Sequence, residues 1–235
     1  MKKLLSILSL CLVFISCSPD RVLVDELTQK GEISYFEGAL FNGVGFNVYE
    51  DGQLKYEQNF KDGKWDGLYQ QWYENGQLQY LVDYKDGKLN GLVKSWYENG
   101  QLKNEGYYKD DKPDGLSKYW YENGQLAGEE NYIDGKLNGL VKTWYENGQL
   151  KGEGYYKDGK LNGLGKTWYE NGQLKNEGNW TNGKMNGLFK GWYENGEAEY
   201  EHHYKNNIRD GLWKSWDENG QLKFEKTYKD GVLIK

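Results

Sequence analysis

The chain has 235 residues and a formal charge of −6, from 30 Lys plus Arg against 36 Asp plus Glu. Charges of both signs are interleaved along it, which argues against the basic patches that bind nucleic acid, so we expect no nucleic-acid partner. Apolar residues make up only 37% but aromatic residues reach 16%, with 32 Gly and 2 Pro; this composition excludes collagen-like and disordered chains and is typical of short strands joined by glycine turns.

Residues 1–17 have the features of an export signal. Lys2 and Lys3 form a basic start, and residues 4–15 are an apolar run of 12 residues. A membrane-spanning helix needs ~20 residues, so this run predicts a signal peptide. It ends at Ser16-Cys17, which resembles the bacterial lipobox, whose Cys becomes the lipidated N-terminus. We therefore predict a lipid anchor at Cys17; the alternative is a plain secretory signal with an incidental Cys.

The anchor sets the expected location. Ser18 follows Cys17, where an inner-membrane retention signal has Asp, so the resemblance implies the outer membrane of a Gram-negative cell envelope, with the exposed side left open. The remaining cysteine, Cys11, lies inside the signal. The mature chain then has no thiol for a disulfide or a Cys-ligated metal, and we expect no cofactor and no metal site. Residues 18–30 are predicted to form a linker and an N-terminal cap.

Residues 31–235 form one repeat array. A phrase that reads Y-E-N-G-Q-L in its commonest form returns eight times at a spacing of 24 residues. A fixed period of this length indicates units that cannot bury their own apolar faces and must stack on their neighbours. The first residue of the phrase stands at Tyr49, Tyr73, Tyr97, Tyr121, Tyr145, Tyr169, Tyr193 and Asp217.

Each unit is predicted to be a β-hairpin, because Asn-Gly or Asp-Gly pairs lie between its apolar stretches. A three-residue loop with Gly100 in the left-handed conformation pairs Trp96 with Leu102. That register places Leu92, Trp96, Leu102 and Tyr108 on one face. These are the steadiest apolar positions of the repeat, so this loop is preferred to a two-residue one.

The second turn of each unit is also expected to need a left-handed residue. At the position of Gly87 the full repeats have glycine except for Asp111 and Asn207, the residue types that best tolerate positive φ. At the position of Leu89, one copy has Pro113. Because proline cannot donate to a strand ladder, this position is predicted to belong to a connection.

The predicted fold class is all-β: an elongated, single-layer antiparallel β-hairpin array of about eight 24-residue repeats. Eight hairpins give ~16 strands and a sheet roughly 75 Å long at ~4.8 Å per strand. Residues 22–28 are predicted to cap one end and residues 228–235 the other.

A tryptophan stripe is the candidate binding face. One interpretation is that these side chains only pack along the sheet. The other is that a single-layer sheet leaves them partly exposed, and large exposed apolar patches mark binding sites. The stripe consists of Trp72, Trp96, Trp120, Trp144, Trp168, Trp192 and Trp216.

Catalytic chemistry is not indicated. The only histidines, His202 and His203, are adjacent, so on a strand they point to opposite faces and cannot share a metal ion. The sequence lacks a Cys–His or Ser–His–Asp nucleophile system and a phosphate-binding glycine loop. Lysines in phase with Lys94 and glutamates in phase with Glu105 predict a solvated face rather than an ion-binding ladder. We expect the protein not to be an enzyme.

The phrase Y-E-N-G-Q-L, followed by E-G-Y-Y-K-D-G-K-L-N-G-L and K-x-W-Y, resembles the MORN-repeat variant over about residues 31–235. It is similar in particular to the YwqK-type proteins labelled as toxin–antitoxin antitoxins. The first unit departs from the pattern, with Ala39 at the turn glycine and Val48 at the Trp position. The resemblance implies a non-catalytic scaffold for protein–protein interaction, here at the cell envelope, with a partner that the sequence leaves unknown.

A looser resemblance gives the alternative function. Choline- and glucan-binding repeats of cell-wall proteins also combine Trp, Tyr and Asn-Gly in hairpins of ~20 residues, and their aromatic cages hold quaternary ammonium groups by cation–π attraction. The alternative is therefore a module that binds a cell-wall glycan or the membrane surface.

Overall fold

The computed structural model describes residues 20–235. The predicted signal peptide and Cys17 lie outside these residues. In the described part of the chain, no helix combines the length and apolar character needed to cross a membrane.

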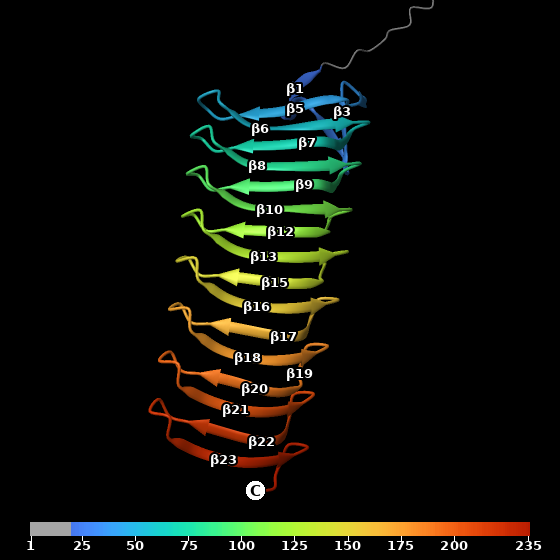
Figure 1. Cartoon of the computed structure of the whole chain (residues 1–235). Coiled ribbons are helices and arrows are strands. Elements are labelled where there is room, and N and C mark those ends of the chain that lie inside the picture. The colour runs from blue at the N-terminus through green and yellow to red at the C-terminus, as the bar shows by residue number, and fades with distance from the viewer. Residues whose placement is uncertain (1–19) are drawn as a thin grey trace, which may run out of the picture.

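The described residues form a long stack of strands (Figure 1). The N-terminal elements are β1 (Arg21–Leu23), the 3-10 turn η1 (Val24–Glu26), β2 (Thr28–Lys30), β3 (Ile33–Phe36) and β4 (Ala39–Leu40). The first half of the stack comprises β5 (Gly43–Val48), β6 (Leu54–Lys61), β7 (Lys64–Trp72), β8 (Leu78–Lys85), β9 (Lys88–Trp96), β10 (Leu102–Lys109), β11 (Lys112–Pro113), β12 (Gly115–Trp120), β13 (Leu126–Ile133) and β14 (Lys136–Leu137). The second half comprises β15 (Gly139–Trp144), β16 (Leu150–Lys157), β17 (Lys160–Trp168), β18 (Leu174–Thr181), β19 (Lys184–Met185), β20 (Gly187–Trp192), β21 (Ala198–Lys205), β22 (Ile208–Trp216), β23 (Leu222–Lys229) and β24 (Val232–Leu233).

The stack is one 21-stranded sheet in which successive strands from β5 onwards pair antiparallel. The short strands β11, β14 and β19 share a partner with the strand that follows each of them. The one parallel pair among the described strands joins β1 to β5, so residues 21–23 cover the first edge of the sheet. Strands β2, β3 and β4 form a separate three-stranded sheet. The predicted all-β array of antiparallel hairpins is confirmed.

The first turn of each repeat is the predicted three-residue loop. Trp96 pairs with Leu102, the N–H of Tyr97 donates to the carbonyl oxygen of Gln101 at 2.9 Å, and Gly100 has a φ of 86°. Only glycine adopts this conformation without strain, which explains why Gly is the fourth residue of the repeated phrase.

The second turn is a two-residue loop with positive φ at both positions. Asp86 has a φ of 50° and Gly87 of 85°, between the paired residues Lys85 and Lys88. This is the type I′ geometry that matches the twist of a hairpin. At the position of Gly87, Asp111 and Asn207 have φ of 66° and 69°, as predicted from the substitutions.

The prediction that Tyr108 shares one face of the sheet with Leu92, Trp96 and Leu102 was wrong. A β-bulge between Leu102 and Asn104 shifts the register of β10, so Leu92 pairs with Tyr107 and Tyr108 pairs with Gly91. One extra residue in a strand reverses the side to which all the following side chains point. Tyr108 therefore lies on the face opposite Leu92 and Trp96.

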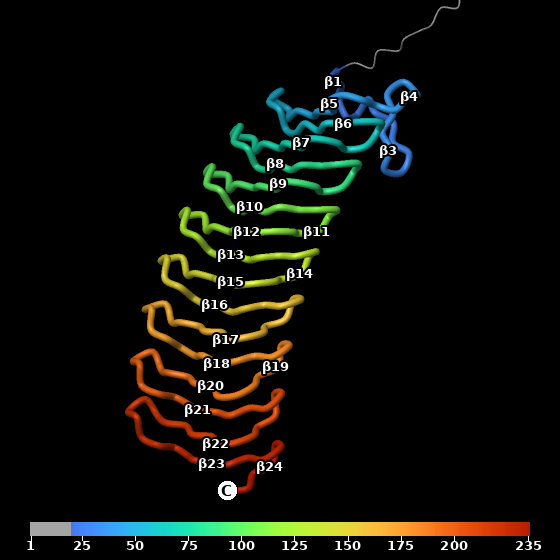
Figure 2. The backbone as a smooth tube through the Cα atoms, turned by 45° about the vertical axis from the view of Figure 1, so that its right-hand side comes forward, coloured from blue at the N-terminus to red at the C-terminus, as the bar shows by residue number. Residues whose placement is uncertain are grey.

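The position of Leu89 and Pro113 is paired, and its assignment to a connection was also wrong. Leu89 pairs with Tyr84, and Pro113 pairs with Tyr108. The break in regular structure comes just after this position, at a glycine in phase with Gly91, which has a φ of 131°. There the strand bends, and in three repeats it is divided into two strands; Figure 2 shows the bent hairpins.

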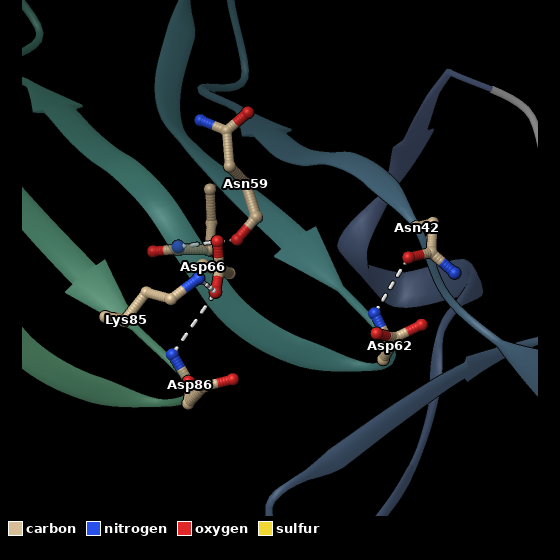
Figure 3. Close-up of polar contacts among 7 residues, drawn as sticks. Asn42, Asn59, Asp62, Asp66, Lys85 and Asp86 are labelled. Carbon is tan, nitrogen blue, oxygen red and sulfur yellow. Dashed lines mark hydrogen bonds and ion pairs between the residues drawn. The ribbon is translucent and has the colours of Figure 1, made fainter.

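Side chains next to the bend fix the adjoining turn (Figure 3). Asn42 Oδ1 accepts the N–H of Asp62 at 2.8 Å. One repeat later, Asp66 Oδ2 accepts the N–H of Asp86 at 3.3 Å and the ammonium of Lys85 at 2.8 Å. This ion pair and hydrogen bond hold the pKa of Asp66 below its usual value. In four of the repeats, the Asn or Asp before the bending glycine thus tethers a type I′ turn.

Two ladders of hydrogen bonds join successive repeats at the other edge. The hydroxyl of each turn tyrosine donates to the carbonyl oxygen of the tryptophan 23 residues later, at 2.6 to 2.9 Å. The turn asparagine does the same with its amide: Asn99 Nδ2 donates to the carbonyl oxygen of Glu122 at 3.1 Å, while its Oδ1 accepts the N–H of Gln101. These bonds explain why Tyr and Asn recur at fixed places in the phrase.

A small hydrophobic core lies at the N-terminal end. Val22, Phe41 and Phe60 are buried there, and Leu27 and Phe36 pack against them. The turn between β3 and β4 has its positive-φ glycine at Gly38, one residue before the in-phase Ala39. The first unit therefore keeps a glycine turn despite its irregular spacing.

Candidate functional site

The two faces of the sheet differ in burial, and we call the more buried one the inner face. Along β9 it carries Val93 and Ser95, and along β10 it carries Gly106 and Tyr108. From β6 onwards, the buried side chains all lie at inner-face positions: Gln58, Phe60, Val82, Ser95, Ser117, Phe189 and Trp213. The opposite side, which carries Leu92 and Lys94, is the outer face.

Three columns of the outer face are the same from the repeat of Leu92 to the last, whereas the column of Tyr107 varies. Leucine recurs in phase with Leu92, lysine in phase with Lys94 and glutamate in phase with Glu105. Lys94 and Glu105 form a cross-strand ion pair at 3.1 Å, and four other repeats form the same pair at 3.0 to 3.8 Å. Exposed pairs of this kind contribute little stability each, so they form a solvated surface.

The seven tryptophans of the predicted stripe each end a strand, and all are half-buried. Strand alternation places Trp96 on the outer face with Lys94, and its copies follow. Their carbonyl groups accept the tyrosine ladder described above. The array thus brings Trp72, Trp96, Trp120, Trp144, Trp168, Trp192 and Trp216 into one column at the edge that carries the three-residue loops.

Five of the seven turn tyrosines beside this column are covered by the chain's own lysines. The ammonium of Lys103 lies 5.3 Å from the centre of the Tyr97 ring, and Lys151 lies 5.4 Å from the Tyr145 ring. Lys55 and Lys175 are placed alike in their repeats, so cations of the protein itself already occupy these aromatic faces.

The inner face has one constant column of aromatic residues: Phe60, Tyr84, Tyr108, Tyr132, Tyr156, Trp180, Tyr204 and Tyr228. The four positions beside it differ from repeat to repeat. In the repeat of Tyr108 they are Val93, Ser95, Asn104 and Gly106, whereas other repeats have residues from glycine to tryptophan. The repeat architecture does not need a particular side chain there, so these positions are free to serve recognition.

At the C-terminal end, aromatic side chains fill the inner face. Trp180 meets Phe189 edge-to-face at 4.8 Å, and Tyr204 packs at 5.3 Å from Phe189 and 5.0 Å from Trp213. A Cβ on Gly178 would collide with the Phe189 ring, so glycine is needed where a ring lies flat on the neighbouring strand.

The two histidines lie on opposite faces, as predicted. His202 is on the inner face, stacked on Trp213 at 3.8 Å and on Tyr200 at 4.6 Å. Burial, and then the charge of Arg209, lower the pKa of His202 from 6.5 to about 4. With this lowered pKa, His202 is neutral at physiological pH. His203 Nδ1 instead hydrogen-bonds the Leu212 carbonyl oxygen at 2.9 Å next to a strand bend.

A carboxylate lies in the middle of the inner face. Glu130 Oε2 accepts the hydroxyl of Tyr132 at 2.5 Å and that of Tyr119 at 3.1 Å. Burial, with this carboxylate, raises the pKa of both tyrosines, so the hydroxyls stay protonated and donate. Among the eight repeats only this one has an acidic residue at that inner-face position.

Hollows lie on either side of the carboxylate. The larger, of about 270 Å3, is lined by Val141, Tyr156, Leu161 and Trp180 among others, and the smaller, of about 190 Å3, is lined by Val93 and its neighbours. The buried polar atoms without a hydrogen-bond partner in the described chain are also on this face: Gln58 Oε1, Ser95 Oγ, Thr167 Oγ1 and His202 Nε2. Within residues 20–235 no three His, Cys, Asp or Glu side chains are grouped to hold a metal ion.

The family model described as "MORN repeat variant" matches the chain eight times, and the first match begins at Phe41, which opens the first regular hairpin. The chain belongs to the MORN repeat variant family. The matches cover residues 41–62, 65–86, 89–110, 113–134, 137–158, 161–182, 185–206 and 209–230, and each spans one three-residue loop and its two strands. The family repeat thus ends at the first residue of each type I′ turn, and the protein is a repeat scaffold.

No curated protein matches the chain. Among solved structures, the chain is similar to part of one described as "Crystal Structure of TcdB2-TccC3-Cdc42", with 10% sequence identity and a TM-score of 0.19. The similarity covers 80% of this chain and only 14% of that one.

The inner-face hollows were not predicted from the sequence. The positions that stay constant build the array. The signal was present at the positions that change, where small residues such as Gly152, Gly154 and Gly165 stand in phase with Tyr200, His202 and Trp213.

Proposed function

We propose that this MORN repeat variant is a non-enzymatic scaffold that binds another protein at the cell envelope, where a lipid on Cys17 holds it. The observation that supports the binding role is the difference in sequence and shape between the two faces. The outer face repeats Leu, Lys and Glu almost unchanged, whereas the inner face changes from repeat to repeat and contains hollows. Repeat proteins characteristically bind along such extended surfaces.

The experiment is affinity capture with the tagged full chain from a detergent extract of the native envelope, read by mass spectrometry. Two variants locate the contact. The double variant Trp144→Ala with Trp168→Ala alters the outer-face tryptophan column, and Gly152→Tyr alters the inner face. One protein recovered near stoichiometry, and lost in one of these variants, supports the proposal. Recovery of no protein at all would reject it.

The identity of the captured protein tests the finer resemblance. The YwqK-type antitoxins suggest a toxin as one class of partner. Recovery of a toxin would support that role, and recovery of an envelope protein without toxic activity would reject it.

The membrane anchor has its own test. Cys17→Ser should move the protein from the membrane fraction to the soluble periplasmic or secreted fraction, while Cys11→Ser should leave its membrane association unchanged. Equal membrane association of both variants would reject lipidation at Cys17.

A glycan-binding module is the second candidate function. It is favoured by two outer-face rings, Tyr107 and Tyr155, which are 55% and 52% exposed. Exposed aromatic rings of this kind can stack on sugar rings, because both surfaces are flat and apolar. Saturable binding of the protein to purified peptidoglycan or lipopolysaccharide, lost in Tyr107→Ala with Tyr155→Ala, would establish this function. Absence of binding at millimolar sugar would reject it.

A further inference from the structure

Three hollows recur on the inner face at a spacing of 48 residues, which is two repeats. Their volumes are about 230, 190 and 270 Å3 in chain order. Four repeat positions line all three: Tyr56, Asn104 and Gly152; Gln58, Gly106 and Gly154; Phe60, Tyr108 and Tyr156; and Tyr69, Ser117 and Gly165. Two repeats are four strands, so neighbouring hollows lie roughly 19 Å apart at ~4.8 Å per strand.

The third hollow exists because its floor consists of small residues. A Cβ added to Gly152 would meet Thr143 Oγ1 at 3.3 Å and the carbonyl oxygen of Lys166 at 3.6 Å, with no ring above it. Two repeats later the same position holds Tyr200, whose ring stacks on His202 and fills the corresponding space. The third hollow therefore owes its size to small residues, whereas the first is lined by the larger Tyr56, Gln58 and Tyr69 at the same repeat positions.

The first hollow is lined in part by a segment from outside the regular repeats. Val24 and Gln29, from the N-terminal segment that crosses the inner face, line it together with Tyr56 and Phe60. Val24 Cγ2 also lies 3.0 Å from the place of a Cβ on Gly45, which pairs with the lining residue Gln58. An apolar side chain from a non-repeat segment thus already packs at the first hollow, whereas no segment of the described chain crosses the second and third.

The chemistry of the third hollow suits one apolar ring. Val141, Tyr156, Leu161 and Trp180 supply apolar walls, and Thr143, Thr167 and Asn176 supply the polar groups. The volume of about 270 Å3 exceeds the roughly 150 Å3 that holds benzene in a protein interior. It falls short of the ~300 Å3 at which pockets for drug-sized ligands begin. A single phenyl, phenol or indole side chain matches this size.

The second and third hollows are separated by the carboxylate of Glu130. Both tyrosine hydroxyls that bind it donate to the same oxygen, Oε2. Within residues 20–235, both of these hydrogen bonds end on Oε2 and none is formed to Oε1. A ligand that spans the two hollows passes this charge, so a cation at that place is favoured and an anion is disfavoured.

The geometry points to an extended segment of a partner protein, with two apolar rings six residues apart and a basic residue between them, bound along the inner face in the second and third hollows. Six residues of extended chain measure about 20 Å, and residues i, i+2, i+4 and i+6 point to the same side. This inference rests on the proposed function, because it takes the partner to be a protein, and it specifies the sequence that the scaffold recognises.

The test measures binding of labelled synthetic peptides to the full chain by fluorescence anisotropy. Each peptide has two tryptophans separated by four, six or eight positions in a Ser/Thr background, with a lysine between them. The expected result is an affinity about tenfold higher for a separation of six than for four or eight. A second peptide with glutamate in place of the lysine should bind about fivefold more weakly, and Glu130→Gln should remove that difference.

Variants that fill the hollows keep the test independent of folding. Gly152→Tyr and Asn104→Tyr introduce the residue that Tyr56, Tyr80 and Tyr200 already provide at this repeat position, so the fold accommodates it. Each variant should lower the affinity for the two-ring peptide at least tenfold. The control is Asn179→Tyr on the outer face, where Tyr107 and Tyr155 are in phase; it should bind as the parent does. Circular dichroism and melting curves confirm that all three variants are folded.

Three results would overturn the inference. Affinity that does not depend on ring separation would reject the paired hollows, and full binding by Gly152→Tyr would reject the third hollow. Binding of a soluble oligosaccharide that is lost in Gly152→Tyr, with no peptide bound, would assign the hollows to a glycan. If the captured native partner is lost only in the Trp144 and Trp168 double variant, the protein-binding function stands and this inference fails.

Discussion

Acid should destabilise the C-terminal repeats through one side chain, His202. In the folded protein, burial between Tyr200 and Trp213, with Arg209 nearby, lowers the pKa of His202 from 6.5 to about 4. The unfolded chain therefore binds more protons between these values, and stability falls as pH decreases from 6.5 towards 4. The shift of about 2.5 units corresponds to ~3 kcal/mol at 1.36 kcal/mol per unit. Because the ring is only half-buried and solvent screens its charge, we expect about 1 to 2 kcal/mol.

Nuclear magnetic resonance measures the pKa directly, because the chain contains only two histidines. His202→Phe assigns the signal and is also the stability control, since it keeps an aromatic ring in the stack and removes the titrating group. The free energy of unfolding is measured with urea and followed by hydrogen exchange in β21 and β22. Between pH 7 and pH 4.5 it should fall by about 1 to 2 kcal/mol more in the parent than in His202→Phe. The carboxyl groups of Asp66 and Asp210, whose pKa values are lowered by hydrogen bonds from Lys85 and Lys229, titrate in both proteins, so the comparison cancels them.

The refuting results are specific. A His202 midpoint at or above 6.5 would show that the ring is not desolvated as the structure has it. An equal pH dependence in the parent and in His202→Phe would show that the protonation of His202 is not coupled to folding.

Three further outcomes are expected. Tyr97→Phe removes the hydroxyl bond to the Trp120 carbonyl oxygen and should cost about 0.5 to 1.5 kcal/mol in chemical denaturation, whereas Tyr107→Phe on the exposed outer face should be neutral; equal effects would contradict the ladder. Gly163→Ala, at a bend with a φ of 131°, should cost about 1 to 3 kcal/mol, against less than about 1 kcal/mol for Gly152→Ala in an ordinary strand; comparable losses would exclude backbone strain as the reason. The carboxyl of Asp66 should titrate below its usual pKa, so its contribution to stability is lost only as pH falls through that lowered pKa. Lys85→Ala should raise the titration midpoint of Asp66, and an unchanged midpoint would show that the ion pair does not form in solution.

The turns and the period could be predicted because their chemistry is local. Gly100 needs positive φ for reasons contained in its own few residues, and the substitutions at Asp111 and Asn207 report the same need. Once both turn types are known, the antiparallel order of the strands follows from the chain's continuity.

The two faces could not be predicted, because their assignment depends on a single extra residue. The bulge between Leu102 and Asn104 moves Tyr108 to the side of Ser95, and no turn signal or change in composition marks it. The prediction that Leu89 lies in a connection failed for a related reason. Strand pairing continues up to the bend at Gly91, and one edge proline at position 113 fits the end of a pairing without breaking it.

The hollows escaped prediction because they depend on neighbours in three dimensions. Gly152 alone looks like any other glycine in a strand. Only the pairing of β15, β16 and β17 shows that Val141, Gly154 and Gly165 surround the same space.

Because every bond of the tyrosine and asparagine ladders reaches only the adjoining unit, the array has a length that can change in whole steps. Excision of 24 residues, from one type I′ turn to the next, leaves each remaining unit with the same kinds of neighbour. The loss of one unit between Val93 and Val141 would shorten the distance between the second and third hollows from roughly 19 Å to roughly 10 Å. Duplication or deletion of one coding unit can therefore change the spacing of the hollows while the fold of each unit stays the same.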